Sequence, residues 1–484
     1  MRLFGRSKFQ ILTLPFLVLL LAGVTAAQTK PDESSKAAAP IKVRSELVLI
    51  PTEVTDSKGN RVTDLRKEDF AVSENGKRQE IAVFEHKTTK TGMMKQAAVP
   101  GGVFTNMVVS NPNRITIFVL DLLNSGFEEQ RQARKELIEF LEKSLDVREP
   151  LCLIAVDGNG AWMVHDFTTD PVVLSEALKN VKQELPDKER PQKRQEIYKL
   201  AQGWNTKSVG ENVAAEESRL TMMQMEFGMK DVGLGERIRQ TLLALTEIGQ
   251  AFSGVPGRKS LIWATAGIPF AMGDGSAFEK STAMQNLGDQ GIARLYEQTW
   301  RTLETANIAV YPLDVSGLAN PAYVNAGTGE PLPQHVTSDA HVVNLEQLAD
   351  MTGGKFCDRS MDGRKCFDLA SEDSSDYYVL GFYEQSGTQK PGWRKLNVQS
   401  SRPGMRVRAR SSYYVGGAEQ PLSSAEQMKL ALFSPIDFTG LAFELRIAGM
   451  TAGSKPGTKS VRFVYTIPGN AVRVDAENGN QVQL

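Results

Sequence analysis

The sequence predicts an α/β fold with a doubly wound, mostly parallel sheet, flanked by small β domains. Between residues 114 and 354, apolar runs of strand length alternate with segments of helical period. Such alternation is typical of a parallel sheet covered by helices on both faces. Period-two alternation without helices precedes this stretch at 43–87 and follows it at 376–415. A chain of 484 residues is long enough for two to four domains.

Residues 1–27 have the parts of a secretory signal peptide. A positively charged start, "MRLFGRSKF", precedes the apolar run "ILTLPFLVLLLAGV" and small residues for cleavage near Ala27. The run is short for a membrane span, although an uncleaved N-terminal anchor is the alternative. We therefore expect export to the periplasm or the cell exterior, with no stable membrane span after cleavage. The polar, Pro- and Ala-rich residues 28–42 are expected to be a disordered leader.

Residues 43–87 are expected to form an N-terminal β unit. Asn75-Gly76 lies between two alternating runs, which is a strong signal for a two-residue hairpin turn. The next residues, 88–113, contain Gly, Thr, Asn and Pro and are expected to be a linker.

The α/β domain is expected to span residues 114–375. Its predicted strands are 114–121, 150–158, 160–167, 258–265 and 308–315, and its predicted helices are 128–145, 170–185, 235–252, 290–307 and 342–354. Asp170 is a typical N-cap with Pro171 in the first turn, and a glycine ends the last helix. The charged, Met-rich residues 186–233 lack a strand pattern and are interpreted as a helical insertion.

Beyond residue 375 the pattern predicts only strands. The runs 376–385, 393–401 and 405–415 form a β-hairpin or sheet extension at 376–415, and residues 416–484 a C-terminal β-rich region. The chain ends within an alternating run, which fits either an edge strand or a domain with a remainder beyond it.

Composition excludes some classes of function. The net charge is −1, from 56 basic and 57 acidic side chains, so no overall field favours nucleic acid or an anionic membrane surface. Three cysteines do not make a disulfide scaffold. Cys152 is interpreted as a buried strand thiol. Cys357 and Cys366 bracket a short polar loop, and both a disulfide closing that loop and two free thiols fit the sequence.

Several separated motifs occur in a family's order. They are "VTDSKGNRVTDLRKEDFAVSENGKRQEIAVFE", "ITIFVLDLLNS", "LADMTGGKFC" with "SSDYYVLGFYE", and "RVRARSSYYV". Over roughly residues 44 to 415 the chain resembles the von Willebrand factor A-related domain proteins of the acidobacterial exported type. The resemblance implies a von Willebrand A (Rossmann-like) domain at 114–375. It also implies protein binding or adhesion rather than enzymatic activity.

In such domains the carboxyl edge of the sheet can carry a metal-ion-dependent adhesion site. Its first loop is Asp-x-Ser-x-Ser, and later loops add a Thr and an Asp. Asp121 and Ser125 match the first and last positions, while Leu123 replaces the middle hydroxyl and Ala266 the distal carboxylate. One carboxylate and one hydroxyl would bind Mg²⁺ weakly, so we expect a degenerate site that requires no cofactor. Bound Mg²⁺ or another divalent metal, held by Asp121 and Ser125, is the alternative.

The expected ligand-binding surface is this carboxyl edge, because open α/β sheets present their crevices there. Its candidate residues are Asp121, Asn124, Ser125, Thr168 and Thr265. We expect a protein partner and no nucleic acid. One alternative is a hydrolase on the same core, although the chain has no Gly-x-Ser-x-Gly motif and its four histidines lack metal-ligand spacing. A purely structural envelope protein is the other.

Overall fold

The computed structural model describes a defined part of the chain. The described residues are 46–88, 103–106, 114–125, 127–143, 149–181, 229–268, 290–315, 338–358, 361, 363–384, 391–416, 431–432, 434–440, 443–455, 457–467, 469, 473–475 and 481–483. The predicted signal peptide, the leader and residues 186–228 of the predicted insertion lie outside this part. The last residues of that insertion belong to helix α5 (Met229–Ala251).

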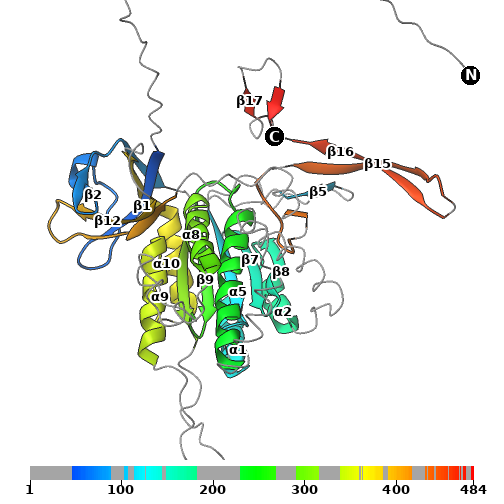
Figure 1. Cartoon of the computed structure of the whole chain (residues 1–484), viewed down its shortest axis with the longest axis horizontal. Helices are drawn as coiled ribbons and strands as arrows, with labels where there is room; N and C mark the ends of the chain where they lie inside the picture. The colour runs from blue at the N-terminus through cyan, green and yellow to red at the C-terminus, as the bar shows by residue number, and fades with distance from the viewer. Residues whose placement is uncertain are drawn as a thin grey trace, which may run out of the picture. The chain divides into compact units, whose positions relative to one another are not determined.

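Five strands form the central sheet in the order β10-β9-β6-β7-β8 (Figure 1). They are β6 (Arg114–Asp121), β7 (Leu151–Asp157), β8 (Gly160–Thr168), β9 (Arg258–Thr265) and β10 (Ile308–Asp314). All are parallel except β8, which is antiparallel to β7. The predicted α/β class with a mostly parallel sheet is therefore confirmed, because strands that are apolar on both faces are buried on both.

Helices cover both faces of this sheet. They are α1 (Phe127–Lys143), α2 (Pro171–Asn180) and α10 (Gly363–Ser375) on one face, and α5, α8 (Gln290–Thr305) and α9 (Ser338–Thr352) on the other. Phe118 and Leu120 of β6 pack in the core beneath α1, α2 and α10. Val119 packs in the core on the opposite face, beneath α5, α8 and α9. As predicted, Asp170 caps α2, with its side chain 2.9 Å from the backbone nitrogen of Val172.

Helix α10 is absent from the sequence-based prediction, which placed a polar loop before Cys366. The helix begins at Gly363, so Cys366 lies in its first turn and is disulfide-bonded to Cys357, with 5.7 Å between the Cα atoms. Its few apolar residues stand among Ser, Asp, Glu and Lys, which hides the helical period.

One β module contains both β segments that the sequence predicts as separate. It has the sheets β13-β1-β11-β4 and β14-β12-β2-β3. The strands are β1 (Glu46–Thr55), β2 (Phe70–Glu74), β3 (Lys77–Gln79), β4 (Val83–Thr88), β11 (Asp376–Glu384), β12 (Gly392–Ser400), β13 (Arg406–Ala409) and β14 (Ser412–Val415). A short 3₁₀ turn (Lys67–Asp69) precedes β2. Strand β1 lies between β11 and β13, so the segments before and after the α/β domain share one core.

Two local features of this module bear on the predictions. Asn75 and Gly76 adopt φ values of 46° and 80° between β2 and β3, as the predicted hairpin turn requires. The run 405–415, predicted as one strand, is two strands in different sheets, since β13 pairs with β1 and β14 with β12.

A buried ionic network joins the β module to the α/β domain. Glu53 of β1 forms ion pairs with Arg258 of β9 and Arg408 of β13, and Asp373 of α10 forms ion pairs with Arg408 and Arg61. Burial raises the pKa of Glu53 to about 7, against the opposing effect of both arginines. Burial acts in the same direction on Asp373, but the surrounding arginines outweigh it and hold its pKa below the usual value.

A third unit is built from the C-terminal region and one strand of the predicted linker. Strands β5 (Val103–Thr105), β15 (Glu444–Ala452) and β16 (Lys459–Thr466) form a sheet in the order β16-β15-β5. Strands β17 (Arg473–Asp475) and β18 (Gln481–Gln483) pair with each other. The segment before β15 is attached to the end of α5, where the Thr439 nitrogen lies 2.8 Å from the Ala251 carbonyl oxygen. None of the described helices is long and apolar enough to span a membrane.

Candidate functional site

The candidate site lies at the carboxyl edge of the central sheet, between β6 and β9. From β6 the chain continues through α1 to β7 on one side, whereas β9 lies on the other side. Adjacent strands whose connections lead in opposite directions leave a crevice at their carboxyl ends. Asp121 ends β6 and Thr265 ends β9, so both side chains lie at this point.

Asp121 is fully buried and accepts hydrogen bonds at both carboxylate oxygens. Oδ1 lies 3.0 Å from the backbone nitrogen of Leu123 and 2.9 Å from that of Asn124. Oδ2 lies 3.0 Å from Asn124 Nδ2, 2.9 Å from Trp263 Nε1 and 2.8 Å from Thr265 Oγ1. A carboxylate offers about four lone-pair sites, so these five donors occupy its acceptor capacity.

The pKa of Asp121 reflects this enclosure. Burial raises it above the usual aspartate value, and the hydrogen bonds from Asn124, Trp263 and Thr265 act in the opposite direction. The Asp121 side chain thus joins the loop after β6 to the end of β9 and to the indole of Trp263. It has no exposed surface to offer to a ligand.

Further hydrogen bonds extend this cluster across three elements. Ser125 Oγ accepts from the Ala266 nitrogen at 3.0 Å, which connects the loops after β6 and β9. Asn124 Nδ2 donates to Thr241 Oγ1 at 2.9 Å, and Thr241 is buried in the middle of α5. Hydrogen bonds of side chains therefore fix the loop after β6 to the end of β9 and to α5.

Four of the five predicted surface residues come together: Asp121, Asn124, Ser125 and Thr265. Thr168 does not, so its predicted position at the carboxyl edge was wrong. Because β8 runs antiparallel, Thr168 pairs with Leu151 at the start of β7, whereas Asp121 is level with Val156 near its end. At about 3.3 Å per residue, Thr168 is on the order of 17 Å away along the strands.

Two partners of Asp121 and Asn124 were not predicted from the sequence. Trp263 lies two residues before Thr265 and hence on the same face of β9, and a buried indole needs an acceptor. Thr241 sits at a buried position of α5 and also donates to the Arg237 carbonyl oxygen at 2.8 Å. Its position within an apolar helical pattern gave no sign of a contact with the loop after β6.

The side chains of this cluster are not suited to be the ligands of a divalent cation. Mg²⁺ requires oxygen ligands in near-octahedral geometry, and the one carboxylate of this cluster is already filled by five donors. Leu123 and Ala266 present apolar side chains that pack against the two cores. The described residues contain no group of three or more His, Cys, Asp or Glu that could hold a metal. Asn124 Oδ1 is the cluster's buried oxygen without a hydrogen-bond partner among them.

The histidines with described side chains do not form a nucleophile–base pair. His86 Nε2 lies 2.8 Å from Asp376 Oδ1, and His165 Nδ1 lies 2.6 Å from the Asp166 carbonyl oxygen. Cys152 is fully buried, and this burial raises the pKa of its thiol well above the usual value, which disfavours the reactive thiolate. His335 and the side chain of His341 lie outside the described part of the chain.

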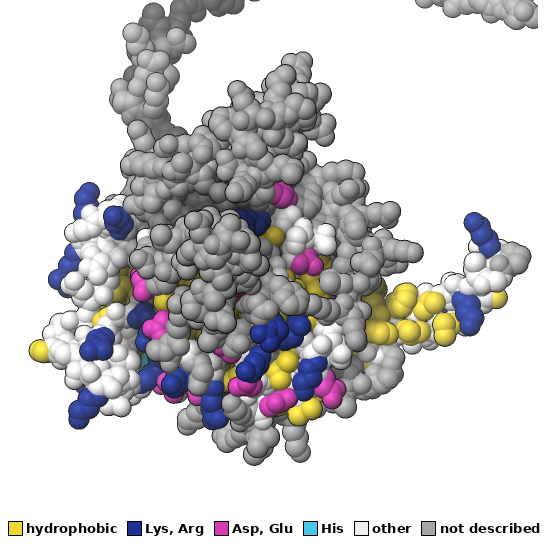
Figure 2. Space-filling model, turned by 90° about the horizontal axis from the view of Figure 1, so that it is seen from below, with side chains coloured by type: hydrophobic (Ala, Val, Ile, Leu, Met, Phe, Trp, Pro, Cys, Tyr) yellow, Lys and Arg dark blue, Asp and Glu magenta, His cyan; other side chains and the backbone are white. Residues whose placement is uncertain are grey.

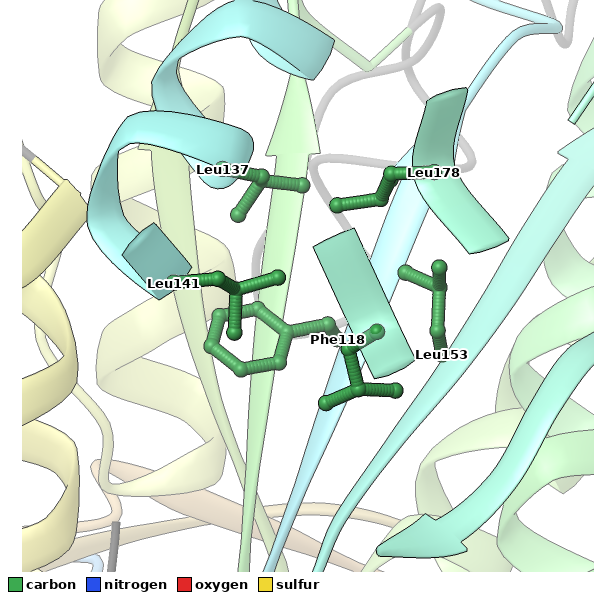
Figure 3. Close-up of a pocket in the computed structure, with 6 residues that line it drawn as sticks. Phe118, Leu137, Leu141, Leu153 and Leu178 are labelled. Atoms are coloured by element: carbon green, nitrogen blue, oxygen red, sulfur yellow. The ribbon is translucent and has the colours of Figure 1, made fainter. Parts of the chain in front are cut away.

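A hollow inside the core is apolar packing rather than a ligand pocket. Figure 3 shows leucines from β7, α1 and α2 directed toward Phe118 of β6. The lining residues are Phe118, Leu137, Leu141, Leu153, Leu174 and Leu178. They leave no room for a water molecule and present no polar group that could orient a ligand.

No model of a known protein family matches this chain, and no curated protein is similar to it.

Proposed function

We propose that this chain is an exported, non-enzymatic protein-binding protein whose carboxyl sheet edge recognises a protein partner without a metal ion. The central domain would be a doubly wound domain of von Willebrand A type with a degenerate metal-ion-dependent adhesion site. The observation that carries the proposal is the hydrogen bonding of Asp121. Five donors hold the loop after β6 in place, which is the positioning that a bound cation would otherwise provide.

The sheet order supports this fold assignment. Strand β6 lies in the middle, the connections diverge at β6 and β9, and helices cover both faces. The motif "ITIFVLDLLNS" coincides with β6 and the loop that holds Asp121 and Asn124. The motif "SSDYYVLGFYE" coincides with β11, which joins the β module to the end of α10.

The disulfide between Cys357 and Cys366 supports export. Disulfides persist in oxidising compartments and are rare in the reducing cytosol, and this one closes the short segment between α9 and α10. The bridge agrees with the signal-peptide pattern of residues 1–27, so both features favour a periplasmic or extracellular location.

Metal independence can be tested by isothermal titration of the mature protein with Mg²⁺, Mn²⁺ and Ca²⁺. We expect no binding heat up to about 1 mM metal, because the only carboxylate of the cluster is saturated. Asp157→Asn is the matched control, since Asp157 ends the neighbouring strand β7 and contacts the Asn159 nitrogen at 2.7 Å. Binding that Asp121→Ala abolishes and Asp157→Asn preserves would overturn the proposal.

Partner recognition can be tested with a photo-crosslinking residue at either end of the sheet. Asn159 is exposed in the β7–β8 turn at the carboxyl edge, and Val172 is exposed in the first turn of α2 at the amino edge. We expect a crosslinked protein partner from position 159 but not from position 172, in equal yield with and without a chelator. Equal capture from both positions, or loss of capture in chelator, would contradict the proposal.

A further inference from the structure

The three-stranded sheet β16-β15-β5 has one apolar face. Residues opposite each other on neighbouring strands share a face. Leu445 pairs with both Phe104 and Tyr465, Ile447 pairs with Phe463, and Met450 follows after a bulge. We define the apolar face by six side chains: Phe104, Leu445, Ile447, Met450, Phe463 and Tyr465. Figure 2 shows hydrophobic side chains gathered along this hairpin, with Lys and Arg toward its tip.

This apolar face is exposed. Apart from Leu445, which is half-buried, its residues keep from 41% to 63% of their surface accessible. In the β module of the same chain, alternating residues such as Val48, Ile50 and Val72 are buried because a second sheet covers them. A sheet with one apolar face gains most of its stability by burying that face against another layer. The sheet β16-β15-β5 therefore has the pattern of one half of a β-sandwich.

Most charges of this sheet lie away from the apolar face. The exception is Lys459, which pairs with Ala452 at the tip of the hairpin and so shares the face of Phe463 and Tyr465. Arg446 pairs with Val464 and Arg462 with Gly449, which puts both arginines on the opposite face. Glu444 lies on that face too, and its carboxylate is 2.7 Å from the Arg446 guanidinium. The centre of the face, from Phe104 to Met450, carries no charge, so the centres of two such faces can meet without bringing like charges together.

We propose that the apolar face pairs with the same face of a second copy of this chain, so that two three-stranded sheets close into a sandwich across a two-fold axis. A two-fold interface uses the same patch on both subunits, which an apolar face with its charge confined to the hairpin tip satisfies. Aromatic side chains offer on the order of 200 Å² each, so five half-exposed large side chains present about 500 Å² per copy. The pair would bury about 1,000 Å², the lower limit for a specific interface, which predicts a reversible dimer.

Two neighbouring residues of β16 give a matched test. Phe463 lies on the apolar face and Val464 on the opposite face, and they are 47% and 48% exposed. Sedimentation velocity of the mature, disulfide-bonded protein between about 1 and about 100 µM measures self-association. We expect a concentration-dependent dimer whose dissociation constant rises at least about 10-fold in Phe463→Asp and less than about 3-fold in Val464→Asp. Met450→Asp and Thr451→Asp, on opposite faces of β15, form a second pair if a β16 variant unfolds.

Three results would overturn this inference: a wild-type protein that stays monomeric over that range, equal weakening by both members of a pair, or the occupation of the face by lipid. Flotation with vesicles of phosphatidylglycerol and phosphatidylcholine tests the last. Vesicle binding by a monomeric wild type that Phe463→Asp abolishes would assign the face to a membrane surface. Capture at position 159 does not involve this sheet, so failure of the dimer leaves the proposed function standing.

Discussion

Replacing Asp121 by alanine tests whether this side chain is a structural centre of the carboxyl edge. The substitution removes the acceptor of five hydrogen bonds. Asn124 Nδ2 keeps Thr241 Oγ1 as an acceptor, and the single hydroxyl hydrogen of Thr265 can turn to the Gly267 carbonyl oxygen at 2.8 Å. The donors left without an acceptor are the backbone N–H groups of Leu123 and Asn124 and the indole of Trp263.

The expected loss of stability follows from these donors. A buried donor left unsatisfied costs about 1–3 kcal/mol, and Leu123 and Asn124 are only partly buried, which places their cost at the lower end. We expect Asp121→Ala to lower the free energy of unfolding by about 3–5 kcal/mol. That is a large share of the about 5–15 kcal/mol typical of a domain.

Urea unfolding, with the slope and midpoint both fitted, measures this loss. Asp121→Asn keeps the shape of the side chain, but it replaces one accepting oxygen by an NH₂ group that faces other hydrogen-bond donors. We therefore expect this variant to lose a similar amount of free energy of unfolding. Asp157→Asn at the end of β7 should change the free energy by less than about 0.5 kcal/mol, as expected for a surface position.

Two results would refute the interpretation of Asp121. The first is a loss below about 1 kcal/mol in Asp121→Ala, which would mean that the five contacts do not hold the edge. The second is a marked stabilisation of the wild type by millimolar Mg²⁺ that the variant lacks, because a ligand that binds only the folded state raises its stability.

Three further predictions concern the rest of the described fold. Arg258→Met leaves the carboxylate of Glu53 buried beside fewer cations, so unfolding titrations should show a loss of about 3–5 kcal/mol, with a smaller loss when Glu53→Gln is added. Cys357→Ser should cost about 2–3 kcal/mol in the same assay, since the bridge to Cys366 spans nine residues, and reductant should then have no further effect. Burial lowers the pKa of Lys259 to about 8. Between about pH 8 and 10.5 this amine is therefore neutral in the folded protein but protonated in the unfolded chain, so the free energy of unfolding rises with pH. The stability of the wild type relative to Lys259→Met should therefore increase by about 2 kcal/mol from pH 7.5 to 9.5.

Elements with a strong local pattern could be predicted from the sequence. Strands β6 and β9 are continuous apolar runs, and their predicted and observed bounds coincide at 114–121 and 258–265. The turn at Asn75-Gly76 and the cap at Asp170 depend on single residues whose backbone or side-chain preferences decide the conformation. These features need no knowledge of distant parts of the chain.

Features that depend on distant contacts could not be predicted. The pairing of β1 with β11 joins residues more than 300 positions apart, and no local pattern encodes that partner. The error at Thr168 is of another kind, because Gly158-Asn159-Gly160 between two strands already indicates a hairpin. An antiparallel β8 follows from that turn, and with it the position of Thr168 at the amino edge.

The two proposed surfaces have a joint consequence for binding. Helix α5 contacts the candidate site through Thr241 and the segment before β15 through Ala251, so one continuous helix connects both regions. A dimer formed through the apolar face would present two carboxyl edges, and a surface bearing many partner molecules would then be held by both. We expect Phe463→Asp to weaken binding to a partner-coated surface by at least about 10-fold, while the affinity for the partner free in solution stays unchanged. Surface plasmon resonance at high and low partner density measures both. An equal loss in both formats would show that Phe463 acts on the binding edge itself rather than through the second copy.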